Sequence, residues 1–184
     1  MHWTNEQHES YRSFSDAAER YCTFVESLLE GRPENFFKRL RFLLSRLVWV
    51  TENLRAKFIV TDRIETSDTL EISDDDDFED AENRLIDNQS ISDCLRELLS
   101  PEVERWTKIT DEDYREEVDR VYMLFDDLAD LYDDLRTGLE IARIAPERPE
   151  HEAVFHWLVQ AEYHWGPHLY KALLTVQDII LESE

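Results

Sequence analysis

Residues 114–139 read YREEVDRVYMLFDDLADLYDDLRTGL, and this stretch decides the fold class. Apolar residues recur in it at alternating steps of four and three, which is the spacing of an α-helical packing seam. We therefore predict a long helix that buries one side. The seam consists of Tyr114, Val118, Val121, Phe125, Leu128, Tyr132, Leu135 and Leu139.

Five aspartates lie between the seam residues. At 100° of rotation per residue they project roughly away from the seam, so we predict that this helix has a solvated acidic side. Acids at such spacing can hold magnesium around a triphosphate, as in all-α nucleotide pyrophosphohydrolases, but those acids must converge across facing helices. The five are Asp126, Asp127, Asp130, Asp133 and Asp134.

Helical spacing of apolar residues recurs on both sides of this stretch. Residues 9–30 predict a helix that Gly31 ends, and residues 34–54 predict a helix with Pro33 at its first position. A short helix over residues 92–99 should stop before Ser100 and Pro101.

Residues 150–181 form the last predicted helical region, after breaks at Pro146 and Pro149. Only three glycines and five prolines occur in 184 residues, too few for the turns of an all-β fold. The predicted fold is all-α, an antiparallel bundle of about five to six helices in a single domain over residues 1–184. Its expected core includes Phe125, Leu128, Leu135, Leu158, Trp165 and Leu169.

The formal net charge of −23 limits the classes of partner. Nucleic acids and anionic membranes would be repelled, whereas a basic protein or a cation would be attracted. Much of the charge lies in residues 61–90, which include Asp74 to Asp77 and which we interpret as a long, mobile acidic loop. A salt-rich habitat explains the same charge balance without any specific ligand.

The remaining compositional features favour a soluble cytoplasmic protein. The N-terminus lacks the basic and apolar regions of a signal peptide, and no apolar stretch is long enough to span a bilayer. Cys22 and Cys94 are too few for a disulfide framework, so buried thiols are expected. Periodicity does not distinguish a monomer from a homodimer.

The predicted helix over residues 34–54 is the one basic element. Its cations can pair with the acidic helix of residues 114–139 inside the fold. If Arg39, Arg41 and Arg46 are instead exposed, they could bind an anionic ligand.

His164 and His168 are four residues apart, which places two imidazoles on one helical face, as in many zinc sites. The candidate metal ligands are His164, His168 and Glu162. For the third position, His151, His156 or an acid of residues 114–139 compete with Glu162, and the spacing selects none of them. The alternative is that both histidines flank a buried Trp165 and bond to neighbouring helices.

Two blocks, DDLADLYDDL at residues 126–135 and HWGPHL at residues 164–169, resemble a bacterial all-helical family known as domain of unknown function 5063. The resemblance covers mainly the second half of the chain and implies a helical fold without an assigned activity. Pro167, between the two histidines, departs from the expected pattern and predicts a kink or a new helix start near Gly166.

The sequence contains no glycine-rich phosphate loop and no motif for covalent catalysis. The function predicted first is therefore a non-catalytic interaction or accessory protein. A metal-dependent enzyme that uses His164, His168 and helix acids is the second prediction. A nucleic-acid mimic that binds a basic protein is the third.

Overall fold

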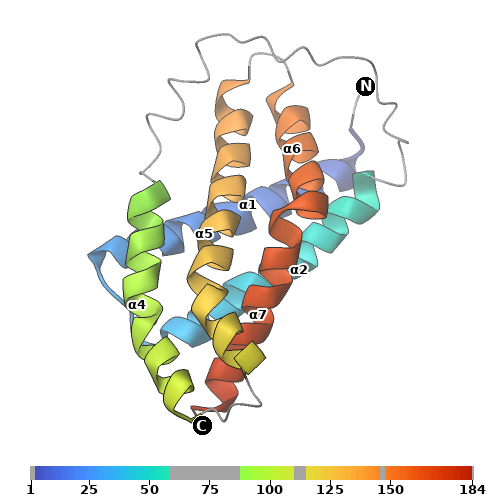
Figure 1. Ribbon diagram of the computed structural model, residues 1–184. Coiled ribbons are helices and arrows are strands. Elements are labelled where there is room, and N and C mark those ends of the chain that lie inside the picture. Colours follow the sequence, from blue (N-terminus) through green and yellow to red (C-terminus); the bar gives the residue numbers. More distant parts are fainter. Residues whose placement is uncertain (1–2, 59–87, 110–114, 146–147, 184) are drawn as a thin grey trace.

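The computed structural model describes residues 3–58, 88–109, 115–145 and 148–183, and within these ranges it contains six α-helices and no strand (Figure 1). The predicted all-α bundle is confirmed for this part of the chain. The helices are α1 (Asn5–Ser27), α2 (Phe36–Phe58), α4 (Asn88–Ile109), α5 (Arg115–Ile144), α6 (Pro149–Tyr163) and α7 (Trp165–Leu181), and a short 3-10 helix, η1 (Leu28–Glu30), follows α1.

Helix α5 occupies the centre of the bundle and packs against α1, α4, α6 and α7. Figure 1 shows α6 and α7 following one another along one side of α5, with α4 on its other side. Helices α1 and α2 cross behind these four, and α2 packs against α1 and α7. A helix with this many neighbours has little surface left for solvent.

The core lies where the apolar spacing predicts it. The buried core includes Phe125, Leu128, Leu135, Trp165 and Leu169, as predicted. Leu158 is only partly buried, so its expected place in the core is wrong. Beyond the predicted seam, α5 also buries Leu124 and Leu131, because neighbouring helices cover it on more than one side.

Gly138 lets α6 approach α5 closely. A Cβ at this position would lie 2.0 Å from Nε1 of Trp157, a fully buried side chain of α6. Nε1 of Trp157 donates a hydrogen bond to the carbonyl oxygen of Leu135 at 3.4 Å. The missing side chain therefore sets the distance between the two helices.

The first interhelical turn agrees with the sequence in one respect and differs in another. Gly31 ends η1 with φ 133°, a conformation that glycine adopts readily. Pro33, however, does not begin α2, which starts at Phe36. Asn35 has φ 56°, and this left-handed residue separates the proline from the helix.

The sequence predicts a helix that stops before Ser100 and Pro101. Both residues instead lie inside the continuous helix α4. Proline cannot donate to the carbonyl four residues earlier, which here belongs to Glu97. Oγ of Ser100 donates to that carbonyl oxygen at 3.1 Å. The serine hydroxyl thus replaces the hydrogen bond that the proline removes.

The charges suggest that the basic helix α2 pairs with the acidic helix α5. Helix α2 instead packs against α1 and α7. Nη1 of Arg41 donates to Oε1 of Gln177 on α7 at 3.2 Å. Nη2 of Arg55 donates to the carbonyl oxygen of Ala161 in α6 at 2.9 Å. These arginines therefore fasten α2 to the last two helices.

Most of the acidic loop predicted over residues 61–90, namely residues 61–87, lies outside the described part of the chain, whereas its last three residues belong to α4. Cys22 is buried and Cys94 is half-buried, and neither forms a disulfide. Within the described ranges, every helix is too short or too polar to cross a bilayer.

Candidate functional site

The two histidines lie at a break between α6 and α7. His164 ends α6 and precedes α7, with φ −131° and ψ −85°, so the new helix start predicted near Gly166 is confirmed. Gly166 is needed at this break because a Cβ there would lie 2.0 Å from the carbonyl oxygen of Ala161. Arg55 satisfies that same carbonyl, which stabilises the end of α6.

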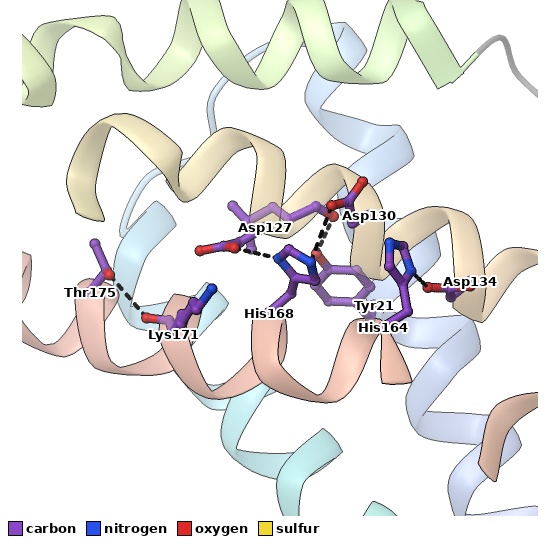
Figure 2. A network of polar contacts seen from close by, with 9 residues as sticks. Tyr21, Asp127, Asp130, Asp134, His164, His168, Lys171 and Thr175 are labelled. Atoms are coloured by element: carbon purple, nitrogen blue, oxygen red, sulfur yellow. Dashed lines mark hydrogen bonds and ion pairs between the residues drawn. The ribbon is translucent and has the colours of Figure 1, made fainter. Parts of the chain in front are cut away.

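This break directs both imidazoles toward α5, where three aspartates meet them (Figure 2). Nδ1 of His164 lies 2.5 Å from Oδ2 of Asp134, and Nδ1 of His168 lies 2.5 Å from Oδ1 of Asp127. Nε2 of His168 is 3.5 Å from Oδ2 of Asp130. His168 therefore lies between two carboxylates of α5.

The aspartates of α5 do not form the solvated acidic side that the helical projection predicted. Asp127 is only 4% exposed and Asp134 only 8%, and none of the five aspartates is fully exposed. The projection assumed one buried seam, whereas α7 covers the side that was expected to face water. Their neighbours are histidines, not acids on a facing helix, so the pyrophosphohydrolase arrangement is absent from this interface.

Burial and hydrogen bonding shift the pKa values of this group in a consistent way. Loss of hydration raises the pKa of Asp127 and of Asp130, and the neighbouring charge of Asp126 raises that of Asp130 further. The hydrogen bond to Asp134 raises the pKa of His164. The histidine opposes this effect of burial, because the hydrogen bond to His168 lowers the pKa of Asp127 and the charge of His168 lowers that of Asp130.

Beneath the aspartates, a neutral hydrogen bond supports the backbone of α5. The buried hydroxyl of Tyr21, on α1, donates to the carbonyl oxygen of Leu128 at 2.8 Å, next to Asp127 (Figure 2). Tyr21 thus anchors the segment of α5 that carries the carboxylates.

One ligand atom each from Asp130, His164 and His168 lies within 4.8 Å of the other two. Because Nδ1 of each histidine faces a buried aspartate, Nε2 is the nitrogen that remains for a ligand. A carboxylate behind an imidazole is the usual arrangement at metal-binding histidines, where it fixes the ring and its tautomer. Ligand atoms of a tetrahedral ion lie about 3.4 Å apart, which is within the 4.8 Å limit that the three ligand atoms satisfy here.

The structure brings together two of the three metal ligands predicted from sequence. His164 and His168 converge, with ring centroids 5.4 Å apart. Glu162 does not join them, because its carboxylate faces Arg55 at 3.6 Å.

The two other histidines considered for the third position also lie outside the cluster. His156 contacts the backbone carbonyl oxygen of Asp134 at 3.3 Å, and burial lowers its pKa. His151 packs against Trp3, with ring centroids 4.4 Å apart and the ring planes tilted by 35°. The residue that completes the cluster is Asp130, one of the acids of residues 114–139 that were also candidates for the third position, although the spacing did not select it.

The chain belongs to a family described as a domain of unknown function (DUF5063), whose sequence profile matches residues 5–182. The match covers nearly the whole chain, whereas the two blocks that resemble the family lie in its second half. Searches found no matching curated protein and no matching solved structure.

Proposed function

We propose that the chain binds one divalent transition-metal ion between α5 and α7, with Asp130, His164 and His168 as its ligands. The observation that carries the proposal is the pairing of each imidazole with a buried carboxylate, 2.5 Å from Nδ1 in both cases. This pairing leaves Nε2 of both rings as the nitrogen for a metal. Oδ2 of Asp130 lies 3.5 Å from Nε2 of His168, and all three residues offer ligand atoms within 4.8 Å of one another.

The donor set favours a particular class of ion. Two imidazoles and one carboxylate suit zinc, iron, cobalt, nickel or manganese better than calcium or magnesium, which prefer oxygen ligands throughout. Three protein ligands leave at least one coordination position for water or a substrate, as in metal sites that perform chemistry. His164 is half-exposed, so this open position can be reached from solvent.

The ion would also relieve the electrostatic cost of the interface. Asp127, Asp130 and Asp134 bring three carboxylates to this face of α5, opposite two imidazoles. One divalent cation bound to Nε2 of both rings would add positive charge at a place where burial disfavours the charged form of the carboxylates. The same residues would therefore bind the metal and fasten α7 to α5.

The test is a titration of the purified full-length protein, freed of metal by chelation, with Zn²⁺ and with Co²⁺. We expect uptake of one equivalent, measured by calorimetry, and a Co²⁺ absorption spectrum typical of nitrogen and oxygen ligands. The variants Asp130→Asn, His164→Ala and His168→Ala should each lose stoichiometric uptake. Asp127→Asn and Asp134→Asn should bind roughly 10 to 100 times more weakly, since they alter only the groups behind the ligands.

Glu162→Gln is the matched control, because Glu162 is adjacent in sequence but bound to Arg55. It should retain full uptake. Asp130→Asn keeps the test decisive if a histidine variant fails to fold, since the Asp130 side chain is about one-third exposed. Absence of stoichiometric binding in the parent protein, or unchanged binding in Asp130→Asn, would overturn the proposal.

The interaction role expected from the net charge remains a prediction alongside the metal site. This role predicts that the chain binds a basic protein and that binding weakens as salt rises from about 0.1 M to 1 M. At 1 M salt the electrostatic screening length falls to roughly 3 Å. A nucleic-acid mimic would in addition lose this binding when duplex DNA is added as a competitor.

A further inference from the structure

The surface that α2 and α7 form together contrasts in charge with the rest of the chain. Nearly one residue in four is acidic in this protein, yet residues 36–51 and 165–177 contain no aspartate or glutamate. Residues 36–51 instead contribute Lys38, Arg39, Arg41 and Arg46. The two acid-free segments belong to helices that pack against each other.

Large apolar side chains are exposed on this same surface. Phe42 is 68% exposed and Trp49 is 59% exposed, and their spacing of seven residues places them on one face of α2. Tyr170 and Leu174, four residues apart on α7, are about half-exposed. Exposed groups of this size, several together, are more informative than a single exposed leucine.

Hydrogen bonds join the two helices beside these side chains. The hydroxyl of Tyr170 donates to Oε1 of Glu52 at 2.9 Å, and Arg41 donates to Gln177 at 3.2 Å. Arg46 lies over the ring of Trp49 at 5.7 Å. We call this surface, which comprises Arg41, Phe42, Arg46, Trp49, Tyr170 and Leu174, the α2–α7 face.

Charge selects among the occupants that such a face could take. In a twofold-symmetric dimer a second copy would bring the same basic side chains against themselves, which costs energy. A bilayer or a nucleic acid presents an extended negative surface, which the net charge of −23 repels. A short acidic segment would contact only this basic face. At 0.15 M salt, charges more than about 8 Å away are largely screened, so the acidic remainder of the surface would repel the segment little.

We propose that the α2–α7 face is a docking surface for an acidic amphipathic helix of a partner protein. The glutamates or aspartates of that helix would pair with Arg41, Arg46 and Lys38, and its apolar side would cover Phe42, Trp49 and Leu174. Arginine and aromatic side chains are the residues that most often dominate the energy of protein interfaces. This inference does not depend on the proposed metal site.

The probe is a fluorescent synthetic peptide of about 18 residues, long enough for five helical turns, with leucines along one side and glutamates beside them. Fluorescence anisotropy with the full-length protein should show saturable binding that weakens steeply as salt rises. The same peptide with lysine in place of every glutamate should not bind. Binding should be unchanged in Asp130→Asn, which separates this test from that of the metal site.

Phe42→Ala, Trp49→Ala and Arg46→Glu should each weaken binding by about tenfold or more. Tyr122→Ala, which removes a 53% exposed aromatic side chain from α5, is the matched control and should bind like the parent protein. Equal binding of the lysine peptide, or less than a twofold effect of Trp49→Ala, would overturn the proposal. So would concentration-dependent dimerisation that Trp49→Ala abolishes, or binding to phosphatidylserine vesicles without binding to the peptide.

Discussion

The two flanks of α7 show opposite ways of departing from a simple amphipathic helix. Toward α5, His168 and the cap residue His164 contact the buried carboxylates of Asp127 and Asp134, so polar groups lie inside. On the flank shared with α2 it carries Tyr170 and Leu174 at the surface, so apolar groups lie outside. Burying charge and exposing apolar area both cost stability unless something compensates, and each flank is therefore where we place a binding role.

The largest expected effect is the difference in lost stability between two leucine-to-alanine variants, one at a buried position and one on the exposed flank. Leu128→Ala removes a fully buried side chain next to Asp127 and should lower the free energy of unfolding by about 2 to 5 kcal/mol. Leu174→Ala makes the same chemical change on the exposed flank and should cost less than about 0.5 kcal/mol. Urea melts of the two variants measure both values, and equal losses would show that the exposed flank is packed in solution.

The second prediction concerns the buried charge of the α5 flank. Asp127→Ala leaves Nδ1 of His168 without its partner and should cost roughly 1 to 3 kcal/mol. Asp126→Ala changes the adjacent, less buried aspartate of the same helix and should stay within about 0.5 kcal/mol. Both are measured by denaturant unfolding in the presence of a chelator. An unchanged free energy of unfolding in Asp127→Ala would mean that its contact with His168 contributes nothing to stability without metal.

The helices were predictable because their signal is local. The four-three spacing of residues 114–139 requires only helical geometry, and the observed helix α5 follows it. Local rules failed where a neighbouring group changed the outcome. Pro101 stays inside α4 because Ser100 supplies the missing hydrogen bond, and Pro33 stays outside α2 because Asn35 turns the chain.

The candidate site was predictable only in part, for a related reason. The spacing of His164 and His168 identifies one half of it from sequence alone. The other half depends on which side of α5 faces α7, and no periodicity in α5 contains that information. The apolar seam suggested that the aspartates face water, whereas tertiary packing covers Asp127 and Asp134.

The third prediction concerns the pH dependence of stability that the contact between His164 and Asp134 gives to the α5 flank. The hydrogen bond to Asp134 raises the pKa of His164 above 6.5, so the folded state binds this proton more tightly than the unfolded state. The stabilisation is therefore fully present below the unfolded pKa of 6.5 and is lost as pH rises through the higher folded value.

The measurement is the difference in unfolding free energy between the parent protein and His164→Asn, followed from about pH 5 to 9 with a chelator present. The difference should be largest at the acidic end and shrink as pH rises. Taking a difference matters because burial lowers the pKa of His156, which acts in the opposite direction in both proteins. A difference that grows with pH would show that His164 is not held as the charged partner of Asp134.

The smallest change in stability is expected on the α2 flank, where it carries the most meaning. The double variant Phe42→Ala with Trp49→Ala removes two exposed rings and should change the free energy of unfolding by no more than about 0.5 kcal/mol per site. Trp157→Ala, at a fully buried position, is the contrasting variant and should cost about 3 to 5 kcal/mol. If the exposed rings prove dispensable for folding yet necessary for binding the acidic peptide, they act through contact with a partner. A large loss of stability in the double variant would instead make them part of the packing between α2 and α7.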